Sequence, residues 1–303
     1  MVWLEERELL RRLRRGDPSA LEELMAGGTP HRFGDIDHTE EDGARIPATP
    51  SYTAYLKIAE GCDHRCAFCI IPKLRGRYRS RTMESLLAEA KTLADAGVKE
   101  LIVIAQDITR YGTDLNGEHQ LSTLLRELCR LDFHWVRLHY LYPDEITEEL
   151  IDTIAEEPKI VKYLDIPIQH CNDGILKAMN RRDTKAELLE LFAKLRARIP
   201  GLVLRTSLIT GLPGEGEAEL EELCDFLRQT RIERAGVFPF SPEEGTRAAQ
   251  MEHVDTEEAR RRAELVVDVQ SDIIDDYNDA VLGTEREVLC EGFDGQAQMY
   301  FGR

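Results

Sequence analysis

The chain has 303 residues, with 57 Asp and Glu against 39 Lys and Arg, which gives a formal net charge of −18. Hydrophobic residues make up 42%, which excludes a disordered chain, and no apolar run reaches the roughly 18–20 residues of a membrane-spanning helix. The composition predicts a soluble, cytoplasmic protein that does not contact a membrane. Because polyanions repel so acidic a chain, a basic partner is favoured and contact with nucleic acid is not.

The first predicted element is a short amphipathic helix that ends near Met25, and a Gly- and Pro-rich linker follows it. From residue 51 to residue 283, short β-branched runs alternate with amphipathic helical patterns. Strands are predicted at Ala54–Ala59, Glu100–Ala105, Trp135–His139, Tyr163–Ile166, Val203–Ile209 and Ala235–Phe240. Helices are predicted at Met83–Ala96, Leu121–Leu131, Ile146–Glu156, Thr184–Arg198 (opened by a capping box), Glu217–Gln229 and Thr256–Val281.

Strand–helix alternation at this spacing is typical of a parallel sheet built from βα units. The pattern contains about six units, and the region is slightly short of the ~250 residues of an eight-unit barrel. We therefore predict an α/β fold with a partial (β/α)6 TIM-like barrel. Residues 284–303 read as a strand, a glycine turn and a second strand, which cannot form a stable domain alone. The predicted domains are a linker at 1–50, the barrel at 51–283, and the start of a C-terminal β module at 284–303.

The loop after the first predicted strand carries three of the seven cysteines, Cys62, Cys66 and Cys69. About twenty residues separate this strand from the next helix, whereas βα loops usually have ~2–6 residues. An odd number of cysteines without an export signal disfavours disulfides and favours a metal site. The remaining cysteines are isolated and are expected to be buried apolar side chains: Cys129, Cys171, Cys224 and Cys290.

Two metal centres are consistent with the three cysteines. One is a structural zinc site, which would make the chain a zinc-stabilised, non-catalytic binding module. Zinc takes four ligands, normally as two separated pairs, and His64 inside the tight loop would be a strained fourth ligand. The other is a [4Fe–4S] cluster, in which three cysteine ligands leave one iron open to an exogenous ligand.

The Cys-x3-Cys-x2-Cys spacing, with Phe68 before the last cysteine, resembles the radical S-adenosylmethionine (SAM) superfamily. The resemblance implies a partial barrel in which Cys62, Cys66 and Cys69 hold a [4Fe–4S] cluster and the open iron binds SAM. Phe68 is then expected near the adenine. A one-electron reductant is also implied, because the reduced cluster cleaves SAM to a 5′-deoxyadenosyl radical.

Polar residues follow the other predicted strands at the same rim of the barrel, where ligands bind in such folds. Gln106 follows the second strand, and Arg205, Thr206 and Ser207 lie in the fifth; we expect these four to contact SAM. His139 and His170 are equally compatible with hydrogen-bonded core histidines. No catalytic residue beyond these binding residues is assigned.

Residues 50–283 more narrowly resemble the radical SAM methylthiotransferases of the RimO type. The shared segments include Tyr55–Cys62, Cys69–Pro72, Tyr142–Pro143, Asp165–His170 and Gly211–Glu215. The resemblance implies methylthiolation of the β-carbon of an aspartate in small-subunit ribosomal protein twelve. The alternative is the MiaB type, which modifies a tRNA adenosine. Three segments favour the RimO type, as does the acidic charge: Ala59–Cys66, Arg234–Phe238 and Ser241–Thr246.

One departure from this family concerns a second cluster. The family carries an N-terminal domain with three further cysteines, whereas residues 1–61 contain none, and only the opening strands of a TRAM domain follow Thr284. We therefore expect a fragment that binds one cluster and SAM and does not insert sulfur unaided.

A basic segment surrounds the three cysteines. Residues 56–82 hold seven basic and two acidic residues, a local charge of +5. Alternation from Lys73 to Arg81 predicts one charged face of an extended segment, either solvated and ion-paired or available to a ribosomal surface or RNA.

Overall fold

The computed structural model describes Arg12 and residues 49–303, and all the elements below lie in the compact unit of residues 42–303. The helix predicted before Met25 and its linker fall outside the described residues, apart from Arg12 and the last two linker residues. Among the described helices, none is long and apolar enough to cross a membrane.

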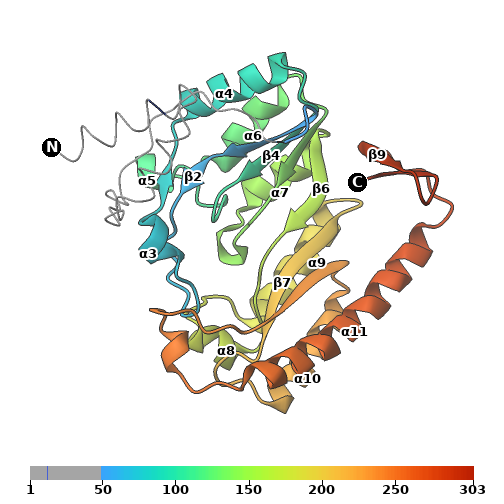
Figure 1. Cartoon of the computed structure of the whole chain (residues 1–303). Coiled ribbons are helices and arrows are strands. Elements are labelled where there is room, and N and C mark those ends of the chain that lie inside the picture. The colour runs from blue at the N-terminus through green and yellow to red at the C-terminus, as the bar shows by residue number, and fades with distance from the viewer. Residues whose placement is uncertain (1–11, 13–48) are drawn as a thin grey trace. The chain divides into compact units, whose positions relative to one another are not determined.

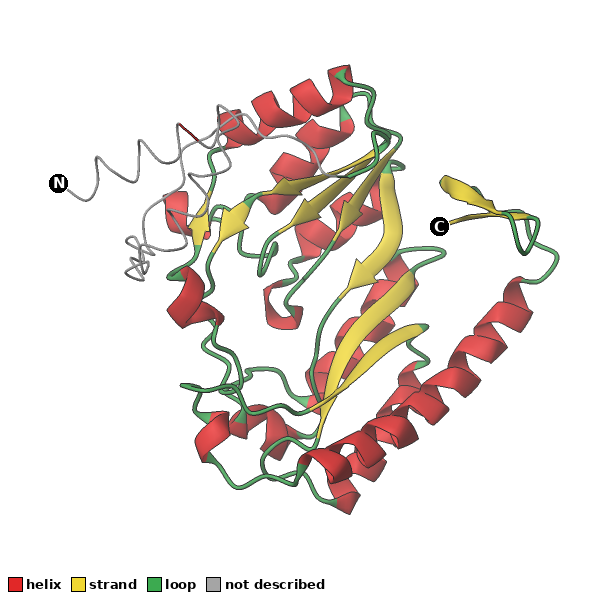
Figure 2. Cartoon of the chain, in the orientation of Figure 1, coloured by secondary structure: helices red, strands yellow, loops and turns green. Residues whose placement is uncertain are grey.

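A sheet of six parallel strands forms the centre of the molecule, in the order β1-β4-β5-β6-β7-β8 (Figures 1 and 2). The outermost strands, β1 and β8, do not pair with each other, so the barrel is open. The predicted α/β class and partial (β/α)6 barrel are thereby confirmed. The strand bounds are β1 Thr53–Lys57, β4 Glu100–Ile104, β5 Trp135–Leu138, β6 Ile160–Asp165, β7 Val203–Thr210 and β8 Arg234–Pro239.

Six longer helices connect the strands or follow the last one, and they cover the outer face of the sheet (Figure 1). Their starts match the cap signals of the sequence: the Thr82 side chain accepts from Ser85 N in α4, and Thr184 forms the predicted capping box in α9. The helix bounds are α4 Met83–Asp95, α6 Leu121–Cys129, α7 Glu148–Glu156, α9 Lys185–Arg198, α10 Glu217–Thr230 and α11 Thr256–Val281.

Short elements inside the loops were not predicted, because they are too short to show a hydrophobic period. Strand β6 also begins three residues before its predicted start at Tyr163. The short elements are β2 Ala59–Glu60, α3 Ile71–Arg75, β3 Arg79–Ser80, α5 Thr113–Asn116, α8 Asp173–Ala178 and the 3-10 turns Pro143–Glu145 and Ala248–Gln250.

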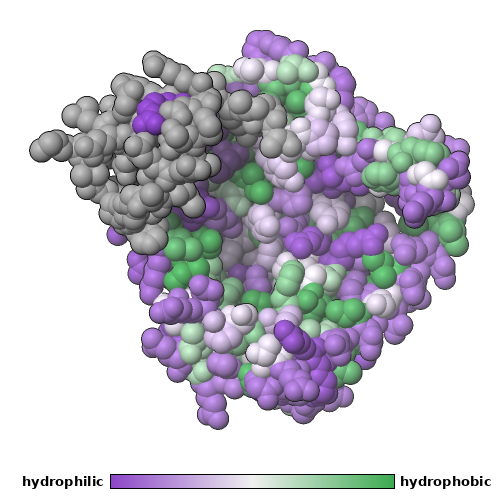
Figure 3. Space-filling model, viewed as in Figure 1, coloured by the Kyte–Doolittle hydropathy of each residue, from purple (hydrophilic) through white to green (hydrophobic). Residues whose placement is uncertain are grey.

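The two faces of the sheet differ in chemistry. In β7, burial alternates with a period of two: Leu204 and Leu208 are buried against the helices, whereas Arg205 and Ser207 are half-buried on the inner face. The main core therefore lies between the sheet and the helices. The inner face is left for polar side chains, and Figure 3 shows the molecule hollowed here, with hydrophilic and hydrophobic residues side by side.

Residues 284–303 contain an antiparallel hairpin of β9 (Cys290–Asp294) and β10 (Met299–Gly302), as the alternating pattern predicts. The hairpin belongs to the same compact unit as the barrel, and the Arg303 guanidinium bonds the buried Glu100 carboxylate at the start of β4. A domain boundary at residue 284 remains a prediction.

Candidate functional site

The cysteine loop spans the gap between the two free edges of the open sheet. It leaves β2, and the Cys62 amide donates to Gly76 O at 3.2 Å. At the other side of the gap, the Ala67 amide donates to Met179 O at 2.9 Å, and the Ala248 amide donates to Ala67 O at 2.8 Å. The loop is therefore attached to the segments after α8 and after β8, at the carboxyl ends of the strands (Figure 1).

The thiols of Cys62, Cys66 and Cys69 are free and partly buried. Burial raises the pKa of Cys62 to about 12, and the charges of Cys66 and Cys69 add to the rise; burial raises the pKa of Cys69 as well. Three thiolates so close together are costly in the absence of a cation. Iron ions supply that cation, so this group of ligands fits an iron–sulfur cluster with one open iron.

The described residues do not contain three His, Cys, Asp or Glu side chains that already converge on a metal position. This holds for the three cysteines as well, so the zinc alternative is judged by its fourth ligand. His64, its predicted fourth ligand, instead places Nε2 2.6 Å from Asp107 Oδ2 and stacks its ring on Tyr142.

Buried polar contacts fix the loop from three directions. Asp107 Oδ1 accepts from the Thr109 amide at 2.8 Å while Oδ2 faces His64. The Tyr78 hydroxyl donates to Asp107 O at 2.8 Å. The Asn180 amide donates to the carbonyls of His64 and Arg65, both at 3.1 Å. These contacts attach the backbone around the cysteines to the segments after β4 and α8.

Phe68 is half-buried and packs against a small apolar cluster that is separate from the main core. Residues of the cysteine loop, of α8 and the residue after it, and of the segments after β7 and β8 form this cluster: Ala67, Ile175, Met179, Leu212, Phe240 and Ala248.

The four predicted SAM-contacting residues are not equivalent. Gln106 follows β4, and its buried Oε1 has no hydrogen-bond partner among the described atoms. Arg205 and Ser207 lie on the inner face. Thr206 lies on the opposite face with 0% exposure, and its hydroxyl donates to Ile166 O at 2.8 Å. Because successive side chains of a strand point to opposite faces, the structure separates Thr206 from Arg205 and Ser207.

The carboxylate of Asp165, which was not predicted as a site residue, organises the inner face. Its Oδ1 accepts from Arg205 at 2.6 Å, and its Oδ2 lies 3.5 Å from His139 Nδ1. Asp165 is 1% exposed, whereas the side chains of Arg205 and His139 are 28% and 27% exposed. The buried carboxylate therefore holds Arg205, with His139 close to its other oxygen, and both of these side chains still face the hollow.

His170 is a buried, hydrogen-bonded histidine, one of the two roles that the sequence allowed for it. It is 1% exposed, its Nδ1 accepts from the Asn172 amide at 3.0 Å, and its Nε2 lies 3.3 Å from Glu215 Oε2. Glu215 also accepts from the Gly211 amide at 2.7 Å and from Arg262 of α11 at 3.1 Å. This network ties the loop after β7 to α11.

The basic segment does not form the predicted extended face. Lys73 and Arg75 lie in α3, which is helical, and the Lys73 amine donates to Gly245 O. Further along, Arg81 pairs with Glu89 at 2.6 Å. Because α3 is helical, the basic side chains that alternate along the sequence do not share one face. The contacts fit the interpretation in which these basic side chains are paired within the protein.

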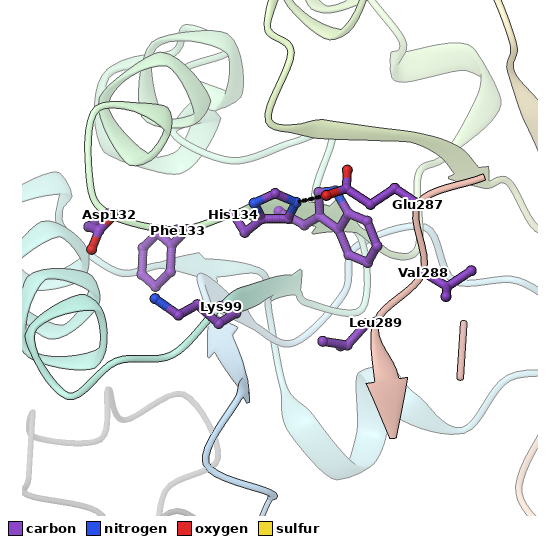
Figure 4. Close-up of a pocket in the computed structure, with 8 residues that line it drawn as sticks. Lys99, Asp132, Phe133, His134, Glu287, Val288 and Leu289 are labelled. Carbon is purple, nitrogen blue, oxygen red and sulfur yellow. Dashed lines mark hydrogen bonds and ion pairs between the residues drawn. The ribbon is translucent and has the colours of Figure 1, made fainter. Parts of the chain in front are cut away.

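A cavity of about 370 Å³ lies at the other end of the barrel (Figure 4). Lys99, just before β4, and His134 and Trp135, at the start of β5, form one wall. Residues 287–289 form the other, and Glu287 bonds His134 at 2.8 Å. The cavity is at the amino ends of the strands, so it is not part of the cysteine site.

Comparison with known proteins gives one family match. Residues 56–227 match the model of the radical SAM superfamily. The chain is 47% identical over 286 residues to ribosomal protein uS12 methylthiotransferase RimO of Caldanaerobacter subterraneus subsp. tengcongensis, which covers 93% of this chain and 65% of that protein. It is 52% identical over 250 residues to RimO of Anaeromyxobacter sp. (strain Fw109-5), covering 82% of this chain and 53% of that protein. The chain thus spans between half and two thirds of the length of these relatives.

Solved structures resemble the fold. Coproporphyrinogen III oxidase (HemN) of Escherichia coli, a radical SAM enzyme, matches with a TM-score of 0.56 at 16% identity, over 73% of this chain and 52% of that chain. The methyltransferase TsrM of Kitasatospora setae, solved with tryptophan and a SAM analogue, gives a TM-score of 0.53 at 18% identity over 64% of this chain and 39% of that chain. At this identity, both show the fold alone.

Proposed function

The chain belongs to the radical SAM superfamily, and on that premise we propose that it is the barrel of a RimO-type methylthiotransferase. One observation carries the proposal: three free thiols share one rigid loop at the carboxyl ends of the strands, where this fold binds its ligands. The relatives at 47% and 52% identity are named for the same chemistry.

Cys62, Cys66 and Cys69 would hold one [4Fe–4S] cluster. The cluster, once reduced by a one-electron donor, supplies the electron that cleaves SAM. We assign a single cluster to this chain because the other cysteines are scattered over separate elements: Cys129 in α6, Cys171 after β6, Cys224 in α10 and Cys290 in β9.

The chain's own residues bind and orient SAM. The buried, unpartnered Oε1 of Gln106 would accept from a donor group of SAM such as the amine or a ribose hydroxyl. Arg205, held by Asp165, would donate to the carboxylate, and the half-buried Ser207 lies next to it on the inner face. Phe68 would pack on the adenine and keep water away from that side.

The proposed substrate is an aspartate in a loop of ribosomal protein uS12, the protein named in both RimO relatives. The net charge of −18 suits a basic ribosomal protein, because opposite charges attract the two partners. A tRNA substrate would need a basic surface that binds RNA. The basic side chains around the cysteines make contacts within the protein instead, Lys73 with Gly245 O and Arg81 with Glu89.

Anaerobic reconstitution of the chain with iron and sulfide tests the proposal. We expect a brown protein with about four irons, as the cluster contains, that converts SAM to 5′-deoxyadenosine and methionine when dithionite is added. Cys66→Ala is expected to lose both the iron and the product, whereas Cys171→Ala, a buried cysteine outside the loop, keeps them. A colourless protein that retains one zinc and leaves SAM intact would contradict the proposal.

A substrate comparison separates the two methylthiotransferase types. Within the complete protein that contains this chain, a peptide with the uS12 loop is expected to acquire a methylthio group. A tRNA anticodon stem is expected to remain unmodified under the same conditions, and the reverse result would favour the MiaB type.

A further inference from the structure

Cys66 differs from the other two cysteines of the loop in what surrounds its sulfur. The hydroxyl of Tyr142 lies 3.9 Å from Cys66 Sγ. The guanidinium of Arg181, which is buried with its carbon 4.0 Å from the Tyr142 ring centroid, brings a positive charge to the same side of the loop. One sulfur thus faces a hydroxyl whose ring carries a cation.

The Tyr142 ring is clamped between two other side chains. On one face, the ring of His64 stacks at a centroid distance of 3.6 Å and an interplanar angle of 7°. On the other face, the guanidinium carbon of Arg181 lies 4.0 Å from the ring centroid, a cation–π contact. The hydroxyl of Tyr142 therefore has little freedom to turn away from Cys66.

Both outer members of this stack are themselves fixed. His64 Nε2 lies 2.6 Å from Asp107 Oδ2. Arg181 donates to Pro167 O at 3.0 Å and to Asp183 Oδ2 at 3.1 Å. The side chains of His64, Asp107, Arg181 and Asp183 are at most 3% exposed.

Burying this many polar groups costs free energy, and apolar groups of similar volume would pack at least as well. We therefore expect the polar groups to have a role that depends on their positions. The groups come from four places in the chain: the cysteine loop, the segments after β4 and β5, and the segment after α8. They meet around the ring of Tyr142, whose hydroxyl faces the sulfur of Cys66. A role at that sulfur accounts for this arrangement.

We propose that Tyr142 and Arg181 are positioning residues that act through Cys66 and raise the reduction potential of the cluster. The inference rests on the proposed function, because it requires a cluster on Cys66. Reduction adds one negative charge to the cluster and its ligands. A hydrogen-bond donor and a positive charge at a ligand sulfur stabilise that charge, so the reduced state becomes easier to reach.

The test is a potentiometric titration of the reconstituted chain, followed by the electron paramagnetic resonance (EPR) signal of the reduced cluster. Tyr142→Phe keeps the stacked ring and removes only the hydroxyl. At a fixed potential we expect the ratio of reduced to oxidised cluster to fall about tenfold, which for one electron is a shift of about 59 mV to lower potential. Arg181→Met is expected to lower the potential as well. Arg181→Lys keeps the positive charge, so its potential is expected to lie between those of Arg181→Met and the unmodified chain.

Tyr111→Phe is the matched control. Tyr111 is also buried, but its hydroxyl donates to Arg81 O at 3.0 Å and does not face a cysteine. Its removal is expected to leave the potential unchanged.

The outcomes separate this inference from the proposed function. If Tyr142→Phe and Arg181→Met bind as much iron as the unmodified chain and show the same potential, the inference is wrong while the cluster stands. If Tyr111→Phe shifts the potential as far as Tyr142→Phe, the effect is a general loosening of the structure and the inference is also wrong. If the unmodified chain binds no cluster, the proposed function itself fails.

Discussion

At the scale of single residues, the cysteine loop depends on Gly61. Its φ is +81°, and a Cβ there would lie 2.0 Å from Arg77 O and 2.8 Å from Gly76 O. Because both neighbours are backbone atoms, the clash is relieved only by moving the loop next to Cys62. We expect Gly61→Ala to lose most of the iron bound on reconstitution, as measured by iron analysis.

Gly97→Ala provides the control for this prediction. Gly97 also has a positive φ, +89°, but nothing lies within 4 Å of the added Cβ. It should lower stability by about 1 kcal/mol, the ordinary cost of a strained conformation, and leave iron binding intact. Equal iron contents in the two variants would show that the loop is not rigid at Gly61.

Asp165 is a second single-residue test. Asp165→Asn removes the charge that holds Arg205 and His139. We expect the dissociation constant for SAM to rise about tenfold, as is usual when the partner of a ligand-binding residue is lost, with iron content unchanged. Calorimetric titration with SAM measures this, and Asp152→Asn, which disrupts an exposed ion pair with Arg198, should bind SAM normally. Normal binding by Asp165→Asn would remove Arg205 from the proposed SAM site.

Residues with a local signal could be predicted from the sequence, and residues defined by distant contacts could not. The cysteine spacing and Phe68 occupy one short segment. Tyr142, which faces the Cys66 sulfur, and Arg181, which lies against the Tyr142 ring, come from separate parts of the chain, and no spacing relates them to the cysteines. The separation of Thr206 from Arg205 follows from the period of two in a strand and was available from the sequence alone.

At the scale of elements, the capping box of α9 gives a stability prediction. The Glu187 amide donates to Thr184 Oγ1 at 3.3 Å, and the Thr184 amide donates to the Glu187 carboxylate at 2.8 Å. Thr184→Ala should lower the free energy of unfolding by about 1 kcal/mol, because it leaves a helix amide without its acceptor. Urea unfolding followed by circular dichroism measures the change.

Thr92→Ala, at an exposed position inside α4, is the comparison for this cap. Alanine is the better helix former there, so the substitution should be neutral or slightly stabilising. A loss at Thr92 as large as that at Thr184 would contradict the capping explanation.

The long elements were predictable because each carries its own period, and α11 has the predicted bounds. The short ones depend on tertiary contacts. Strands β2 and β3 consist of two residues each, held by pairing across the cysteine loop, and α3 interrupts a charge pattern that suggested an extended segment. No window of the sequence contains the partners that stabilise them.

At the scale of the whole molecule, Glu100 links the barrel to its C-terminal hairpin. The carboxylate is 0% exposed, accepts from Arg137 at 2.7 Å and also bonds Arg303. Burial alone would raise its pKa, but the hydrogen bonds and charges of Arg303 and Arg137 outweigh burial and hold the pKa below its usual value of 4.5. The ionised carboxylate therefore stabilises the folded state above pH 4.5, and this contribution is lost as the pH falls through the lower folded pKa.

We expect Glu100→Gln to be less stable than the unmodified chain by about 2 kcal/mol at pH 7, the typical value of hydrogen bonds to a charged group. The difference should shrink as the pH is lowered below 4.5. Urea unfolding at several pH values measures it, and a difference that stays constant down to pH 3 would refute the assignment.

The order of six parallel strands followed from strand–helix alternation, because consecutive βα units pack side by side. The polar inner face of the sheet could not be predicted from the sequence, because charged residues in a strand give the same pattern whether they line a hollow or face solvent. Asp165, 1% exposed between Arg205 and His139, becomes visible as a site residue only when β5, β6 and β7 lie next to one another.

The central claim is that Cys62, Cys66 and Cys69 hold a cluster with one iron open to SAM. The most direct test is the EPR spectrum of the reduced, reconstituted chain with and without SAM labelled with ¹⁷O in its carboxylate and ¹⁵N in its amine. The account predicts that SAM changes the spectrum and that both labels couple to the cluster. A spectrum that SAM leaves unchanged, or a chain that binds zinc and no iron, would contradict it.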